Sequence, residues 1–295
     1  MKQPDYNGDD WAIYITDSVE WMSVAPESSI DLAIYSPPFG DLFIYSDSER
    51  DMGNSSANGE FVKHYRFFCE ALLRAIKPGR IVAVHCSDLP SRKTRDGFIG
   101  LQDFSGDLIR AHQSAGFIYH GRTTVWKDPV VEMQRTKALG LLYKQLRKDS
   151  SMSRPGMPDY VLLFRKPGDN EFAITHQPSD FPVEIWQQWA SPVWMNIKQG
   201  DVLNARVPKA DKDEKHICPL QLGLIERLVV LYSSHDEVVF DPFSGIGSTG
   251  YVAIKQRRKY VGCELKPEYA ALSAGFLAEA EASRVDLFSR MKASA

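Results

Sequence analysis

The sequence feature that most restricts the possible folds of this chain is a glycine-rich turn near its end. The apolar run Glu237–Asp241 predicts a buried strand, and a turn with Gly245, Gly247 and Gly250 leads from it into a predicted helix. This Gly-x-Gly-x-x-Gly spacing lets the backbone bend sharply and approach a ligand, while the helix amino end offers free N–H groups. Glu264 ends the next predicted strand, about 20 residues further on, where a carboxylate can bind ribose hydroxyls. The pattern predicts an α/β fold with a nucleoside-cofactor site.

Two cofactor classes fit this site: a nicotinamide dinucleotide and S-adenosylmethionine. A dinucleotide fold needs a series of βα units after the glycine turn, and only one further clear strand follows it here. A dinucleotide-binding fold would also leave a second unusual stretch of the sequence unexplained. S-adenosylmethionine is therefore the favoured cofactor.

That second stretch is a Ser-Pro-Pro-Phe sequence directly after the apolar run Ile30–Tyr35. The run predicts a buried strand that stops at the carboxyl edge of a sheet, where open α/β folds bind their ligands. Two consecutive prolines keep the backbone extended and remove two N–H donors, so nearby carbonyls can face a substrate. Ser36 adds a hydroxyl and Phe39 a flat ring that can stack on a planar substrate.

Composition limits the alternatives. A chain of 295 residues, 43% hydrophobic and 25% charged, can form one large α/β domain with insertions or two small domains. No apolar run approaches the roughly 20 residues that cross a bilayer, and the polar start predicts no secretory signal. The four cysteines are scattered, which predicts neither a zinc site nor a disulfide framework and favours a reducing cytoplasm.

Net charge is −3, yet residues 122–166 hold ten Lys and Arg against four Asp and Glu. This local excess indicates either a basic face that contacts phosphates or a solvated charged helix. Around it, we expect residues 40–60 to form a loop that closes over a substrate. We expect a helix over Glu60–Ile76, ended by Pro78 and Gly79, and an irregular segment over 167–207 in which at least two of three tryptophans fill a small core.

Five stretches carry a resemblance to a known family. They are, in chain order, Tyr14–Glu20, Ser36–Phe39, His216–Gln221, Asp241–Gly247 and Gly262–Tyr269. Together they resemble the permuted (beta-class) DNA amino-methyltransferases, the cytosine-N4 and adenine-N6 modification enzymes of bacteria and phages. In that class the catalytic half precedes the cofactor half.

The resemblance implies a Rossmann-like, seven-stranded fold with one reversed hairpin strand, in a single methyltransferase domain over residues 1–295. Residues 127–158, a basic insertion, and 167–207 become candidate DNA-recognition regions. The implied catalytic residues are Ser36, Pro37, Pro38 and Phe39. The implied residues at the S-adenosylmethionine site are Asp17, Asp241, Pro242, Phe243, Gly245, Gly247 and Glu264. The candidate DNA contacts are Arg135, Lys137, Lys144, Arg147 and Lys148, and no metal is expected.

The resemblance also implies a reaction. A base flipped out of duplex DNA would stack on Phe39, while Ser36 and the carbonyl of Pro37 accept hydrogen bonds from its amine. Methyl transfer would be a direct displacement without a covalent enzyme intermediate, so Cys86 is expected to be structural, and His85 and Asp88 structural or phosphate-facing.

Serine at the first motif position favours cytosine-N4 over adenine-N6. Methylation of RNA or of a protein amide, and a silent nucleic-acid-binding fold, remain open. A homodimer, a cognate restriction nuclease, and a bacterial or phage-infected host cytoplasm are further implied.

Overall fold

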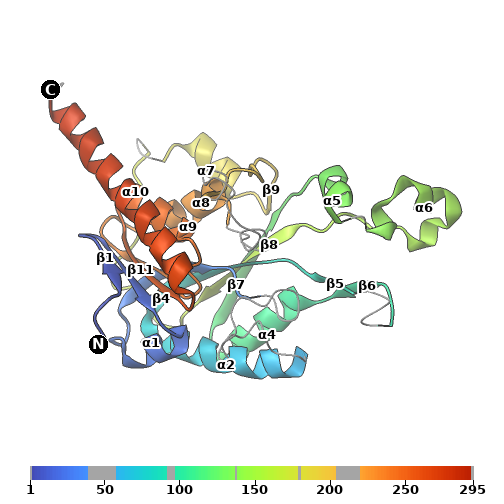
Figure 1. The fold of residues 1–295 in the computed structure, drawn as a ribbon, viewed down its shortest axis with the longest axis horizontal. Helices are drawn as coiled ribbons and strands as arrows, with labels where there is room; N and C mark the ends of the chain where they lie inside the picture. Colours follow the sequence, from blue (N-terminus) through green and yellow to red (C-terminus); the bar gives the residue numbers. More distant parts are fainter. Residues whose placement is uncertain are drawn as a thin grey trace.

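The computed structural model describes residues 2–38, 58–91, 97–136, 138–178, 181–203 and 220–293. Its centre is a nine-stranded sheet (Figure 1). In spatial order the strands are β1 (Tyr6–Asn7), β2 (Trp11–Ile15), β11 (Lys259–Glu264), β10 (Val238–Asp241), β3 (Ile30–Tyr35), β4 (Ile76–Cys86), β8 (Asp159–Arg165), β7 (Ile118–Val125) and β9 (Val193–Trp194).

The five strands from β2 to β4 run parallel, and β8 is reversed between β4 and β7. Seven strands, β2 to β7 in spatial order, therefore form the predicted sheet with one reversed strand. The two-residue strands β1 and β9 extend it at its edges. The predicted α/β, Rossmann-like fold is confirmed.

Helices cover both faces of the sheet (Figure 1). On one face lie α1 (Ser18–Val24), α2 (Asn58–Ala75) and α4 (Phe104–Ala115), and on the other α8 (Leu222–Tyr232), α9 (Ser248–Lys255) and α10 (Pro267–Ala293). Neighbouring strand residues alternate between the two cores: Leu32 and Val239 pack in one, Ala33 and Phe240 in the other. Because both faces are covered, the central strands are apolar almost throughout.

Between β3 and β10, which are parallel neighbours, the side of the sheet on which the chain adds its next strand changes. β3 is followed in the chain by α2 and the neighbouring β4, whereas β10 is followed by α9 and β11 on its opposite side. The strand order thus creates a switch point at the carboxyl ends of β3 and β10, which is where open α/β sheets bind ligands.

An arm projects from the sheet between the carboxyl end of β7 and the amino end of β8 (Figure 1). It contains α5 (Pro129–Thr136), the 3-10 turns η2 (Leu139–Leu141) and η3 (Ser150–Met152), and α6 (Tyr143–Lys148). A small two-stranded sheet of β5 (Leu89–Ser91) and β6 (Gly100–Gln102) lies near it in this view. The segment after β8 contains α7 (Val183–Trp189) and β9.

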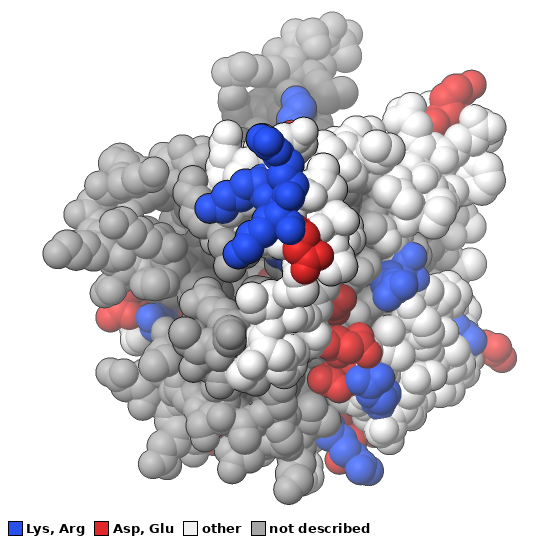
Figure 2. Space-filling view, turned by 90° about the vertical axis from the view of Figure 1, so that its right-hand side faces the viewer, with Lys and Arg blue, Asp and Glu red and all other residues white. Residues whose placement is uncertain are grey.

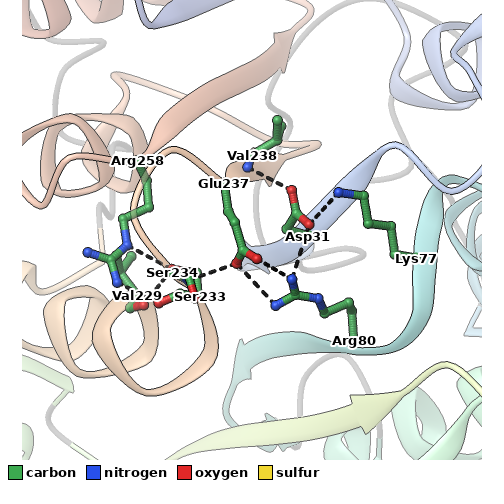
Figure 3. A network of polar contacts seen from close by, with 9 residues as sticks. All are labelled: Asp31, Lys77, Arg80, Val229, Ser233, Ser234, Glu237, Val238 and Arg258. Atoms are coloured by element: carbon green, nitrogen blue, oxygen red, sulfur yellow. Dashed lines mark hydrogen bonds and ion pairs between the residues drawn. The ribbon is translucent and has the colours of Figure 1, made fainter. Parts of the chain in front are cut away.

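An ionic network closes the opposite, amino edge of the central strands (Figure 3). Arg80 of β4 is 2% exposed and pairs with Asp31 at the start of β3 and with Glu237 just before β10. Asp31 also accepts a hydrogen bond from the Val238 amide at 3.0 Å and binds Lys77 at 2.6 Å. The network therefore links three adjacent parallel strands at the edge away from the switch point.

Three local expectations are wrong. The helix before β4 ends at Ala75 without help from Pro78 and Gly79, because β4 begins at Ile76 and an irregularity in its register accommodates them. The sequence predicts a final helix over Tyr269–Ser283, but the helix is longer and spans Pro267–Ala293. Of the three tryptophans, only Trp194 is buried, while Trp186 is 53% exposed. The loop expected over 40–60 lies almost wholly outside the described residues.

Within the described residues, no helix has the length and apolar character needed to cross a membrane. No cluster of metal-ligating side chains is found among them either.

Candidate active site

The two motif-bearing stretches meet at the switch point. Ser36, Pro37 and Pro38 follow β3 directly, and the glycine turn follows β10, the strand beside it. The rings of Tyr35 and Phe243 lie 5.6 Å apart, so the ends of the two strands are in contact. Folding thus brings together segments that are about 200 residues apart in the chain, as the switch-point rule predicts.

The glycine turn is shaped by positions that tolerate no side chain. Gly247 has φ +85°, and a Cβ there would lie 2.1 Å from the Ser273 hydroxyl of α10. Gly250 sits in α9 where a Cβ would lie 2.5 Å from the Tyr260 ring, so it permits close packing of helix and sheet. Gly245 has φ +52°, and a Cβ added there would meet no atom within 4 Å among the described residues beyond its chain neighbours. The backbone at Gly245 therefore faces open space where a ligand can approach.

Glu264 lies at the end of β11, next to this turn. One carboxylate oxygen accepts the Gly245 amide at 2.8 Å and the other accepts the Lys266 amide at 2.9 Å. Burial raises the pKa of the Glu264 carboxyl, and these amide hydrogen bonds offset part of the rise. The Leu265 amide acts on this carboxylate as well, and the carboxylate, which has about four acceptor sites, still has room for a hydrogen bond from a hydroxyl.

Asp241 ends β10 and is buried below the turn. Its carboxylate accepts the Phe243 amide at 3.0 Å, which holds the turn after Pro242 in place. Burial raises the pKa of Asp241 to about 7.

Asp17 caps α1 by accepting the amides of Val19 and Glu20 at 2.7 and 3.2 Å. It follows β2, which pairs with β11, so its carboxylate and that of Glu264 lie at neighbouring strand ends. The pKa of the buried Cys263 thiol is raised by burial and further by Asp241, Asp17 and Glu264, which shows that the three carboxylates share one region. A cationic group would be attracted there.

Ser36 contacts His85, a residue for which the sequence predicts a structural or phosphate-facing role. The Ser36 Oγ lies 3.3 Å from His85 Nδ1 and 3.1 Å from the His85 carbonyl oxygen, both at the end of β4. His85 Nε2 lies 3.2 Å from the carboxylate of Asp159 at the start of β8, an ion-pair contact that is not aligned as a hydrogen bond. Lys127 binds the other Asp159 oxygen. No sequence motif marks this series of contacts, because its members come from four separate segments.

Cys86 is fully buried beside His85, and burial raises the pKa of its thiol well above the usual value. A thiol in this state is a poor nucleophile. Asp88 accepts the Ser105 amide at 3.2 Å, near the start of α4. The contacts of Cys86 and Asp88 are therefore those of residues with a structural role.

Sequence reasoning also missed three buried hydroxyls around the start of α9. The side-chain oxygens of Ser248 and Ser273 have no hydrogen-bond partner within the described part of the chain, whereas the Thr249 hydroxyl faces the Asp241 carboxylate and lowers its pKa. Unpaired buried hydroxyls are costly, so a polar ligand group would satisfy them. Together with the open space at Gly245 and the free lone pairs of Glu264, they fit the amino-acid and ribose portions of S-adenosylmethionine.

The candidate DNA contacts lie away from this turn, on the arm. Lys144, Arg147 and Lys148 are exposed on α6. Figure 2 looks onto the end of the molecule that carries the arm and shows Lys and Arg side chains gathered there in one patch. Arg135 lies in α5, with its side chain not described, and Lys137 and Phe39 lie outside the described residues.

Comparison with known proteins agrees with this geometry. A family model for N6 and N4 methyltransferases, described as DNA methylase, matches residues 30–275. The Type II methyltransferase M.PvuII of Proteus hauseri is 24% identical, over 92% of this chain and 85% of its own length. M.BglI of Bacillus subtilis is 26% identical over 56% of this chain, and the match spans only 40% of M.BglI.

Two solved structures share the fold. A DNA modification methylase of Thermus thermophilus, complexed with S-adenosyl-L-methionine, superposes with a TM-score of 0.67 at 21% identity, over 91% of this chain and 95% of that one. The cytosine-N4-specific PvuII DNA methyltransferase has a TM-score of 0.65 at 21% identity, over 94% and 89% of the two chains.

The fold, together with these similarities, defines an S-adenosylmethionine-dependent methyltransferase. The chain belongs to the DNA methylase family of N6 and N4 methyltransferases.

Proposed function

We propose that this protein transfers a methyl group from S-adenosylmethionine to the N4 amine of a cytosine flipped out of duplex DNA. The observation that carries the proposal is the pairing of β3 with β10 and the ring contact between Tyr35, which directly precedes the Ser-Pro-Pro segment, and Phe243, which precedes the glycines of the turn. A base held at the first segment would lie next to a methyl donor held at the second. Such positioning, with electrostatic stabilisation, is sufficient for a direct displacement.

The chain's own residues have distinct parts in this proposal. Glu264 would bind the ribose hydroxyls, and Gly245 and Gly247 would leave room for the methionine portion of the cofactor. Asp17 and Phe243 would border the adenine or the sulfonium, and Asp241 would hold the turn. When bound, the cofactor supplies an activated methyl group.

At the other segment, Ser36 and the Pro37 carbonyl would accept hydrogen bonds from the target amine and orient its lone pair. Pro38 would keep this backbone extended. Phe39, which lies outside the described residues, would stack on the base.

The order of segments supports assignment to the permuted beta class. β3 and the Ser-Pro-Pro segment precede β10 and the glycine turn in the chain. We also propose that residues 1–295 act as one methyltransferase domain.

Serine at position 36 favours cytosine-N4, and adenine-N6 is the alternative, because either amine can donate to a hydroxyl. RNA or a protein amide as substrate is a less favoured alternative, because the site would read an amine and not the polymer. A silent nucleic-acid-binding role is also less favoured, because the chain has both the Ser-Pro-Pro-Phe sequence and the glycine turn.

DNA recognition is assigned to the arm within residues 127–158 and to the segment 167–207, which contains the exposed Trp186. A homodimer, a cognate restriction nuclease and a bacterial or phage-infected cytoplasm complete the proposal.

The test uses purified protein, S-adenosylmethionine and unmethylated DNA of mixed sequence. The DNA is digested to nucleosides, and mass spectrometry measures N4-methylcytosine and N6-methyladenine. We expect N4-methylcytosine, and its loss in Ser36→Ala. N6-methyladenine alone would select the adenine alternative. Methylation of neither base, with cofactor still bound, would contradict the proposal.

A further inference from the structure

Ser36 is the first member of a series of polar contacts that leads away from the proposed substrate position. The series runs from the Ser36 hydroxyl to His85 Nδ1, from His85 Nε2 to Asp159, and from Asp159 to Lys127. It crosses three strand ends, β3, β4 and β8, and its inner part is enclosed: the side chain of His85 is 13% exposed and that of Asp159 is 4% exposed.

The charges along this series are arranged to accept a proton at the imidazole. Burial raises the pKa of the Asp159 carboxyl, but His85 and Lys127 lower it by more than burial raises it. The pKa of Asp159 therefore lies below its usual value. Asp159 is therefore ionised at neutral pH and faces the Nε2 side of the ring. A carboxylate there stabilises an imidazolium, while Lys127 prevents Asp159 from being an unpaired buried charge.

The two contacts of the Ser36 hydroxyl match two protonation states of His85. When the ring is neutral, Nδ1 accepts a hydrogen bond from the Ser36 hydroxyl, and the lone pairs of the Ser36 oxygen can accept a hydrogen bond from a substrate amine. With a protonated ring, Nδ1–H donates to Ser36 Oγ, and the hydroxyl can donate instead to the His85 carbonyl, 3.1 Å away. Both states satisfy the donors of this contact without movement of the backbone.

We infer that His85, oriented by Asp159, is a positioning residue that takes up, through Ser36, the proton released by the target amine. The inference rests on the proposed function. It extends that function by giving the released proton a defined acceptor.

Atoms and electrons balance in this step. The amine lone pair forms the new N–C bond, and the S–C bond of the methyl donor breaks with its electron pair moving to sulfur. The methylated nitrogen, now positively charged, releases one proton to Ser36 Oγ, while the Ser36 hydroxyl proton moves to His85 Nδ1. The products are a neutral methylated base and an imidazolium beside Asp159, and the imidazolium later loses its proton to water.

Other ionisable groups lie on the far side of β4. Side chains alternate along a strand, so His85 and Cys86 point to opposite faces. Asp88, Asp103 and Arg122 act electrostatically both on Cys86 and on the nearby Tyr160 phenol, and Asp159 acts on Cys86 as well. On the His85 side, the facing groups are Ser36 from β3, Asp159 from β8 and Lys127 after β7.

The test measures single-turnover methyl transfer to DNA between pH 5 and 9 in the wild type and in His85→Asn. Asparagine keeps a polar atom near the position of Nδ1 but cannot take up a proton. We expect the wild-type rate to fall toward acid as the imidazole is protonated. His85→Asn should be slower by about 10²-fold at neutral pH and should lack this acid limb. Cofactor affinity, measured by calorimetry, should be unchanged.

Asp159→Asn provides a second, matched variant. Because it removes the carboxylate that stabilises the imidazolium, the acid limb should move to lower pH, and so should the imidazole titration followed by NMR without cofactor or DNA. An unchanged titration would overturn the role of Asp159. An acid limb retained in His85→Asn would overturn the inference but leave the methyltransferase function intact. A wild type that methylates no DNA would overturn both.

Discussion

Asp241 shows how a single residue can hold a functional turn at a cost in stability. Its buried carboxyl has a pKa of about 7, because burial disfavours the charged form. The hydrogen bond from the Phe243 amide compensates only part of this desolvation penalty. In an unfolded chain the same carboxyl has a pKa of about 3.9. Between these two values the native protein binds a proton that the unfolded chain does not.

The sign of the resulting pH dependence follows from linkage. Since the native pKa is raised, the contribution of Asp241 is fully present below about pH 4 and is lost as the pH rises through 7. Asp241→Asn keeps the acceptor for Phe243 and carries no charge. Without cofactor, its free energy of unfolding should exceed that of the wild type at pH 8, by up to the order of 4 kcal/mol, and the difference should shrink toward pH 4.

Urea denaturation at a series of pH values measures this difference. The control is Asp169→Asn, an exposed change on the loop after β8. A difference between Asp241→Asn and the wild type that does not vary with pH would show that the carboxyl is not the source.

At the scale of elements, the arm differs from the rest of the chain. Its helices α5 and α6 are short, and α6 has no buried residue. Helix propensity alone does not stabilise helices as short as these. The arm therefore needs tertiary contacts, such as the ion pair at 3.2 Å between Arg154 and the buried Glu132 of α5. An exposed helix with Lys144, Arg147 and Lys148 on its surface is suited to contact phosphates rather than to fill a core.

Arg147→Ala combined with Lys148→Ala should therefore weaken DNA binding for every sequence and lower the salt dependence of log Kd by about 2 units. Binding is measured by fluorescence anisotropy over a series of salt concentrations. Lys255→Ala with Lys259→Ala, two exposed cations on α9 and β11, is the matched control and should bind as the wild type does. Equal effects of both pairs would point to general charge attraction and against an arm-specific contact.

At the scale of the whole molecule, the two edges of the sheet have different tasks. The carboxyl edge carries loops, open space and unpaired hydroxyls, whereas the amino edge is closed by the network of Asp31, Arg80 and Glu237 (Figure 3). This network ties β4 and β3 of the proposed catalytic half to β10 of the cofactor half. Its integrity fixes how the two halves meet at the site.

Arg80→Met should destabilise the protein by about 3–5 kcal/mol, because it leaves two carboxylates in a buried region without their shared cation. Lys77→Met, which removes a partly exposed partner of Asp31, should cost about 1 kcal/mol or less. Chemical denaturation measures both. Similar losses in the two variants would contradict the central place of Arg80 in the network.

Several features could be predicted from the sequence because their physical cause is local. The strand, glycine turn and helix around Gly245–Gly250 depend on backbone freedom and apolar runs, and the structure forms them in that order. Ser36 and Glu264 could be assigned to strand ends for the same reason. The register irregularity in β4 escaped prediction, because proline and glycine usually end an element, and only pairing with β3 and β8 shows that the strand continues past them.

The sequence by itself determined the fold class and the cofactor, and it pointed to the two segments that we propose as the site. Apolar periodicity, glycine spacing and chain order are sufficient for these, since they depend on short stretches of chain. Only the tertiary structure decided that Ser36 contacts His85, which in turn contacts Asp159 and, through it, Lys127. It also decided that Arg80 joins three strands at the opposite edge of the sheet. Those contacts join residues from distant segments, and their strength comes from a shared low-dielectric environment that exists only after the sheet has formed.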